Sequence, residues 1–156
     1  MNMVKIKSLV SNLKVAYPHI TFNESTIDKW SPETQTVNYN PSQSHAEAYL
    51  LHELAHGLLA HQSYKKDIEL LQIERDAWSY AKKILGPQFN VTISDEIIDR
   101  SLDTYRDWIH TKGTCSRCEA SGVEIAPRQY FCICCSHRWS VNEGIDAHIK
   151  RYSQKA

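Results

Sequence analysis

Two histidines and a glutamate near the middle of the chain have the residue types and spacing of a metal site. His52, Glu53 and His56 stand in the order His-Glu-Leu-Ala-His. Residues four apart in a helix lie about 40° from each other around its axis, so both imidazoles can reach one cation, and zinc favours such ligands. Glu53 points about 100° away from His52, where it can reach a water on the metal without binding the metal itself. The alternative is that core hydrogen bonds satisfy all three side chains.

The flanking sequence predicts the helix that this spacing requires. Ser44 is a good N-cap residue, and Glu47 three positions later would complete a capping box. Between Ala46 and Ala60 almost every residue other than the three just named is apolar. We therefore expect a helix that protein surrounds on most sides.

A second helix is expected to supply the third ligand, because catalytic zinc usually has three from the protein. The chain from Asp67 has a helical apolar stripe and reaches a stop signal at Gly86-Pro87. Glu74 falls within the stripe, where burying an unpaired carboxylate would cost several kcal/mol. Zinc coordination would account for Glu74, and an ion pair with a cation such as Arg75 is the alternative.

His61 competes with Glu74 for the role of third ligand. It lies about 140° from His56 around a continuous helix, so it cannot join the same site unless the helix breaks. We interpret His61 as a residue that interacts with the helix dipole, or as one at the rim of the site.

These residues together resemble the gluzincin metallopeptidases, most closely the ImmA/IrrE type and the minigluzincins. The resemblance covers about residues 35–87 and rests on His52 to His56 followed by the Glu-Arg-Asp-Ala segment that begins at Glu74. It implies that His52, His56 and Glu74 bind a catalytic zinc and that Glu53 is the general base. In one departure, Trp78 stands where the thermolysin-like branch has an acidic residue that supports a ligand histidine.

The rest of the first part of the chain predicts elements that would position this site. A helix is expected over residues 3–16, then strands at 19–22, 27–30 and 36–39 in a small antiparallel sheet, and a later helix over 95–111 that Ser94 caps. An edge strand beside the metal could pair with an extended peptide. The resemblance to gluzincins assigns this substrate-binding role to the strand before the zinc helix, with residues Gln35, Thr36, Val37, Asn38 and Tyr39.

Four cysteines near the C-terminus form a second candidate metal site. They stand in two Cys-x-x-Cys pairs, at Cys115 and Cys118 and at Cys132 and Cys135. This spacing is typical of a closed structural zinc site in a zinc ribbon, and the alternative is redox or unbound cysteines. Cys134 is left over and would be buried or would exchange with a neighbour as ligand. Basic and aromatic residues around the pairs make nucleic acid a possible partner of the ribbon, although packing on the protease or recruiting a protein is at least as good an explanation.

Length and composition allow one hydrophobic core with a small appendage, and the predicted helices and strands give the fold an α+β class. The chain has 156 residues, 18 lysines and arginines against 18 aspartates and glutamates, and no apolar run long enough for a signal peptide or membrane span. We expect no membrane association, a cytoplasmic location, and cysteines that bind metal instead of forming disulfides. The expected domains are a zincin-like domain (1–111), a zinc ribbon (112–141) and a C-terminal helix and tail (142–156).

The predicted function is zinc-dependent endopeptidase activity through a metal-activated water. The resemblance to the ImmA/IrrE type implies that the substrate is a specific intracellular protein. The expected cofactors are one catalytic and one structural zinc ion. A SprT-like protease acting on DNA-associated proteins is one alternative, although that class uses a third histidine where this chain has Glu74. A non-catalytic zinc-binding interaction protein is another.

Overall fold

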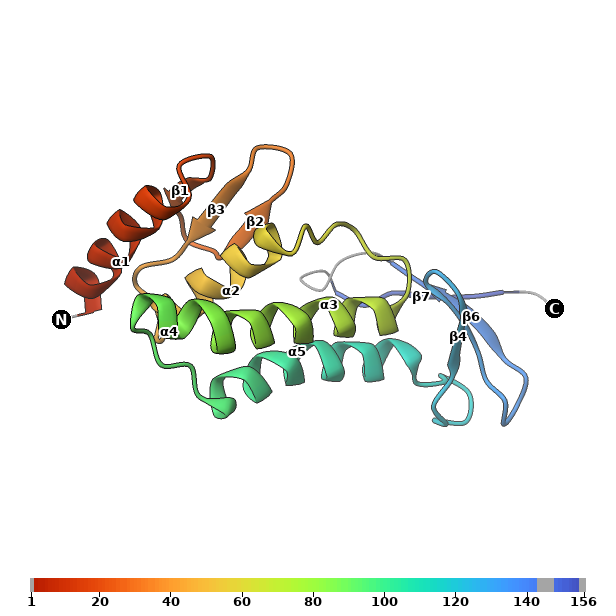
Figure 1. Ribbon diagram of the computed structural model, residues 1–156. Helices are drawn as coiled ribbons and strands as arrows, with labels where there is room; N and C mark the ends of the chain where they lie inside the picture. The colour runs from red at the N-terminus through yellow and green to blue at the C-terminus, as the bar shows by residue number, and fades with distance from the viewer. Residues whose placement is uncertain (1, 143–147, 155–156) are drawn as a thin grey trace. The chain divides into compact units, whose positions relative to one another are not determined.

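The computed structural model describes residues 2–142 and 148–154 and has the expected α+β class (Figure 1). Contacts divide the chain into two compact units. The first unit contains the chain up to Ser63 together with Ile73–Ile98, and the second contains Tyr64–Gln72 together with the chain from Asp99 onward. In the described part of the chain no helix is long and apolar enough to span a membrane.

The first unit contains a three-stranded sheet and the helix that carries His52 and His56. Helix α2 contacts strands β2 and β3 and, elsewhere, the π-helical segment η1, so it lies between the sheet and η1 (Figure 1). The elements in chain order are α1 (Asn2–Ala16), β1 (Thr21–Glu24), β2 (Lys29–Ser31), β3 (Thr36–Tyr39), α2 (Ala46–Leu58), the C-terminal part of α3 (Asp67–Tyr80), η1 (Ala81–Leu85) and α4 (Gly86–Phe89).

Strand β3 is the centre of this sheet, with order β1-β3-β2. It pairs parallel with β1 and antiparallel with β2, so the sheet is mixed. Val37 lies opposite Phe22 on one side and Trp30 on the other, and all three are buried. The prediction that the strand before α2 presents a free edge is therefore wrong. Strand β3 has a partner strand on each side, and the buried side chains of Phe22, Val37 and Trp30 lie side by side across the three strands.

Strand β2 approaches α2 closely at Gly57. A Cβ atom at that position would lie 2.9 Å from the Trp30 ring, so glycine is what allows the indole to pack against the helix. Leu50, Leu51 and Leu54 of α2 are fully buried. Helix α1 buries four apolar residues that recur at helical spacing: Ile6, Leu9, Val10 and Leu13.

Two helix boundaries differ from those predicted. Helix α2 begins at Ala46, and the residue before it is His45 in the left-handed region (φ 59°), without a side-chain capping bond, so the predicted capping box at Ser44 is wrong. The helical path also does not end at Gly86-Pro87 as predicted. Segment η1 and helix α4 continue it to Phe89. Pro87 stands in the first turn of α4, directly after the π-helical segment η1.

The second unit contains the C-terminal part of α5 (Asp95–Gly113) and a four-stranded antiparallel sheet. Ser94 caps α5 as predicted, with its Oγ accepting a hydrogen bond from the Ile97 N–H at 3.4 Å. The strands lie in the order β4-β5-β6-β7. Their bounds are β4 (Val123–Ala126), β5 (Gln129–Phe131), β6 (Arg138–Val141) and β7 (Arg151–Ser153).

Strand β7 lies where the sequence predicted a C-terminal helix and tail (142–156), so the predicted helix is wrong at residues 151–153. It pairs with β6, with Val141 opposite Arg151 and Trp139 opposite Ser153. This pairing satisfies backbone groups that would otherwise be left at the edge of β6. Residues 143–147 of the predicted helix lie outside the described residues.

A buried polar network joins the start of α3 to the ribbon within the second unit. Lys112 Nζ lies 2.6 Å from Asp67 Oδ1, and the Tyr130 hydroxyl donates to the other oxygen of Asp67. Burial and the Asp67 carboxylate raise the pKa of Tyr130, which stays protonated. Lys112 also lies 3.5 Å above the Trp108 ring, in a cation–π contact. These contacts put the start of α3 and the end of α5 in one unit with the ribbon, whereas the expected boundary fell between residues 111 and 112.

Candidate metal centres

His52, His56 and Glu74 converge in the first unit, as the spacing predicted. His52 Nε2 lies 3.0 Å from Glu74 Oε2 and 3.1 Å from His56 Nε2, and His56 Nε2 lies 3.4 Å from Glu74 Oε1. All three side chains are buried. Helix α2 supplies the two imidazoles from one face, and α3 supplies the carboxylate.

These separations fit a single bound cation. Nitrogen and oxygen ligands about 2.0–2.1 Å from a tetrahedral zinc ion lie about 3.4 Å from one another. The two Nε2 atoms also face each other, an arrangement that a cation between their lone pairs would stabilise. The group could therefore hold a metal ion.

Within the described residues, the ion pairs of Glu74 are with these two histidines alone. Arg75, the alternative partner considered from the sequence, is exposed. Burial raises the pKa of Glu74, but the hydrogen bonds from His52 and His56 outweigh it and lower that pKa to about 2. Glu74 is thus held as a carboxylate, the form that a metal ligand requires.

Glu53 lies beside this group with one oxygen anchored. Its Oε2 accepts a hydrogen bond of 2.8 Å from the backbone N–H of Trp30 in β2. Its Oε1 lies 4.0 Å from His52 Nε2, and 15% of the side chain is exposed. The carboxylate is therefore fixed through one oxygen while the other faces the candidate metal ligands.

Two further side chains contact the candidate ligands: Trp78, for which sequence reasoning predicted no contact, and His61, for which a place at the rim of the site was one of two interpretations. The His52 ring stacks on Trp78, with ring centroids 4.1 Å apart and planes 17° apart. His61 Nδ1 lies 3.0 Å from His56 Nδ1. Burial, together with His56, lowers the pKa of His61, which favours its neutral form. Trp78 was noticed as a departure from the family pattern, but a sequence gives no sign of ring stacking.

The predicted substrate strand lies within the sheet. Val37 and Tyr39 are buried, and Asn38 uses its side chain to bond Asn23 of β1 and the backbone of Lys29 in β2. Gln35 lies in the turn before β3 with φ 49°, and Thr36 begins the strand. Substrate binding by residues 35–39 stays a prediction, without the free edge that motivated it.

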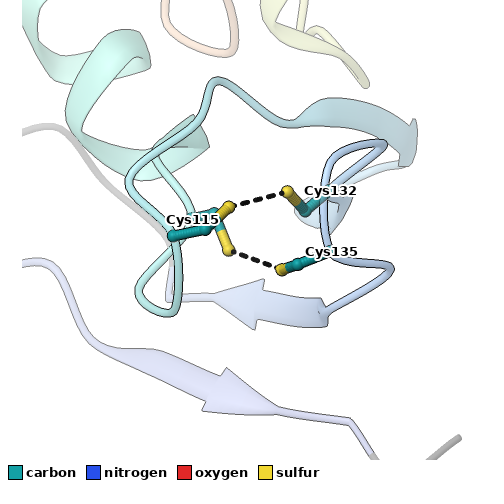
Figure 2. Close-up of side chains that lie close together, drawn as sticks. Cys115, Cys132 and Cys135 are labelled. Carbon is teal, nitrogen blue, oxygen red and sulfur yellow. Dashed lines mark hydrogen bonds between the residues drawn. The ribbon is translucent and has the colours of Figure 1, made fainter.

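The four predicted cysteines come together in the second unit. Cys115 Sγ lies 3.6 Å from Cys135 Sγ, and Cys118 Sγ lies 3.5 Å from Cys132 Sγ. Figure 2 shows the sulfur atoms of the labelled cysteines turned toward one point between the two loops. Sulfur ligands about 2.3 Å from a tetrahedral zinc ion lie about 3.8 Å apart, so this group could also hold a metal ion. Cys134 is exposed and lies outside the cluster.

No family model matches the chain, and no curated protein or solved structure matches it. The functional interpretation therefore rests on the two groups of candidate ligands and on the side chains around them.

We expect metal binding at the cysteine cluster to release protons. A thiol must lose its proton to bind a metal ion. The Ala120 backbone N–H lowers the pKa of Cys118, but the surrounding sulfur atoms outweigh it and raise the pKa to about 12, so this thiol is protonated at neutral pH. Calorimetric titration of metal-free protein with zinc, in two buffers of different ionisation enthalpy, measures the release. An apparent enthalpy that does not change between the buffers would contradict the expectation.

Proposed function

We propose that the protein is a zinc-dependent endopeptidase of the gluzincin kind with a structural zinc in its ribbon. The observation that carries the proposal is the position of Glu53. Its carboxylate is anchored to the Trp30 backbone on one side and faces the His52, His56 and Glu74 group on the other. A purely structural metal site has no use for a carboxylate held next to the ion without binding it.

In this proposal His52, His56 and Glu74 would hold the zinc, which would supply a lowered pKa of water and a Lewis acid for the carbonyl of the scissile bond. Glu53 takes the proton of the attacking water on Oε1, while the Trp30 N–H keeps the carboxylate in place through Oε2. Glu53 then donates this proton to the nitrogen of the leaving amine. The substrate is a protein or peptide, and the resemblance to the ImmA/IrrE type suggests one or a few regulatory proteins.

The SprT-like alternative needs a third histidine among the ligands. His61 is the nearest candidate, but its Nδ1 faces Nδ1 of His56, on the side of that ring away from Glu74. Glu74 instead supplies the third candidate ligand atom. The ligand group thus favours the gluzincin proposal.

The metal content of a Glu74→Ala variant tests the ligand assignment. We expect it to contain one zinc fewer per chain than the wild type, because a buried carboxylate is removed from a three-residue ligand set. Glu33→Ala is the matched control, since Glu33 is an exposed carboxylate of the same unit. Plasma emission spectrometry of the dialysed proteins gives the zinc content.

The same preparations test the activity on an unfolded, fluorescently labelled protein. We expect the wild type and Glu33→Ala to cleave it and Glu74→Ala to leave it intact. Equal zinc content in all three proteins would remove the basis of the ligand assignment. Loss of zinc in Glu74→Ala without cleavage by the wild type would favour the binding-protein alternative.

A further inference from the structure

The chain leaves the helical path just after α2 in a turn that brings the His61 ring against His56. The helix ends at Leu58, and Ala60 adopts a left-handed conformation with φ 53°. The His61 N–H then donates to the His56 carbonyl oxygen at 3.0 Å. This turn places the two rings at a centroid distance of 5.2 Å, with Nδ1 of each facing the other at 3.0 Å. The helix therefore breaks between His56 and His61, as a contact between their rings requires.

The two nitrogens of His56 face different partners. Nε2 lies toward His52 and Glu74, in the group that could hold a metal ion, and Nδ1 lies toward His61. An imidazole that binds a metal through Nε2 keeps its proton on Nδ1, and that N–H is normally held by an acceptor. An unprotonated Nδ1 of His61 can be this acceptor, and His61 then carries its own proton on Nε2.

We propose that His61 is a positioning residue for the metal site, which accepts the Nδ1–H of His56 and so fixes the tautomer and orientation of that ligand. The inference rests on the proposed metal binding by His56, but it does not depend on peptide cleavage. His61 acts through His56 and is not itself a ligand, because its Nδ1 contacts the nitrogen of His56 that faces away from Glu74.

His52 shows why one such contact matters in this site. Its Nδ1 is buried and has no hydrogen-bond partner among the described residues, and its ring is instead held by stacking on Trp78. Of the two candidate ligand imidazoles, His56 alone thus has its second nitrogen held by a side chain of the described chain. The loss of His61 would leave both imidazoles without such a partner.

Replacement of His61 by leucine and by asparagine separates hydrogen bonding from packing. Leucine fills a similar volume but accepts no hydrogen bond, whereas asparagine places an amide oxygen near the position of Nδ1. We expect His61→Leu to weaken metal binding at the His52, His56 and Glu74 site by about 10–100-fold and His61→Asn to recover most of that loss. His19→Leu, at an exposed histidine of the same unit, is expected to bind as the wild type does.

Chelator competition on the full chain loaded with cobalt(II) measures these affinities. Thiolate-to-cobalt charge-transfer absorption identifies the ion in the cysteine cluster, so the other site is followed separately. Wild-type affinity in His61→Leu would overturn the proposal. Equal weakening in His61→Leu and His61→Asn would overturn it too, because packing alone would then explain the contact.

A measurement on the wild type covers the case in which His61→Leu does not fold. Long-range proton–nitrogen correlation spectra of the zinc-loaded protein report which nitrogen of each imidazole is protonated. We expect a proton on Nδ1 of His56 and none on Nδ1 of His61, and the reverse assignment would overturn the proposal. Neither readout involves cleavage, so a protein that behaves as expected here but cleaves nothing would contradict the peptidase function alone.

Discussion

Glu53→Gln is expected to lower kcat/KM for cleavage of an unfolded protein by about 10²–10⁴-fold, the usual contribution of a general base. Glutamine cannot take a proton from water, but its amide oxygen can still accept the hydrogen bond that the Trp30 N–H donates to Glu53. We therefore expect the fold around α2 and the zinc content to be unchanged. Rates measured with the same labelled substrate, alongside zinc content and thermal unfolding, check both expectations.

Glu24→Gln is the control for this charge change, because Glu24 is an exposed carboxylate on β1 of the same unit. It should cleave at the wild-type rate. A Glu53→Gln protein that kept its zinc and its full activity would exclude Glu53 as the base. A variant that lost its zinc would be uninformative about the base, and Glu53→Asp with its shorter reach would then be compared at equal zinc content.

The second large effect is expected at the ribbon, where Cys115→Ser should leave the strands around the cluster unfolded. Structural zinc in small modules supplies an apparent binding free energy of about 10–16 kcal/mol, which is also folding free energy. Two of the ligands, Cys115 and Cys132, also form part of the ribbon's apolar core with Tyr130, Trp139 and Val141, so loss of the metal disrupts that core as well. Loss of one ligand should therefore unfold the ribbon.

Hydrogen exchange at the Trp139 indole N–H measures this unfolding. The group is buried and donates to the Lys112 carbonyl oxygen at 2.9 Å, so its exchange should be slow only while the ribbon is folded. We expect fast exchange in Cys115→Ser and in chelator-treated wild type. Cys134→Ser, which changes an exposed cysteine outside the cluster, should keep slow exchange. Slow exchange in metal-free protein would show that the apolar core alone holds the ribbon.

The candidate ligands were predictable because they depend on short spacings within regular elements. The separation of His52 from His56 is fixed by the helical repeat, and the burial of Glu74 follows from its place within an apolar stripe. The cysteine cluster was likewise predicted from two Cys-x-x-Cys pairs. In both groups the side chains are common metal ligands, and their spacing brings them together only in a few local structures, such as one face of a helix.

The surroundings of the site depend on features that short patterns do not encode. The left-handed turn that brings His61 to His56 occurs at Ala60, a residue type that gives no sign of such a conformation. The order of the first sheet depends on where β1 pairs, and its sequence does not specify whether β3 is central. The partner of Glu53 is a backbone N–H of β2, which any residue type except proline would offer.

We expect the network of Asp67, Lys112 and Tyr130 to make the folding of the ribbon depend on the start of α3. A chain cut after residue 111 would retain Asp67 but lose both of the side chains that neutralise and bond its carboxylate. A chain begun at residue 112 would carry a buried lysine and tyrosine without their acceptor. A graft of the ribbon onto another protein would therefore have to include the start of α3 and the end of α5.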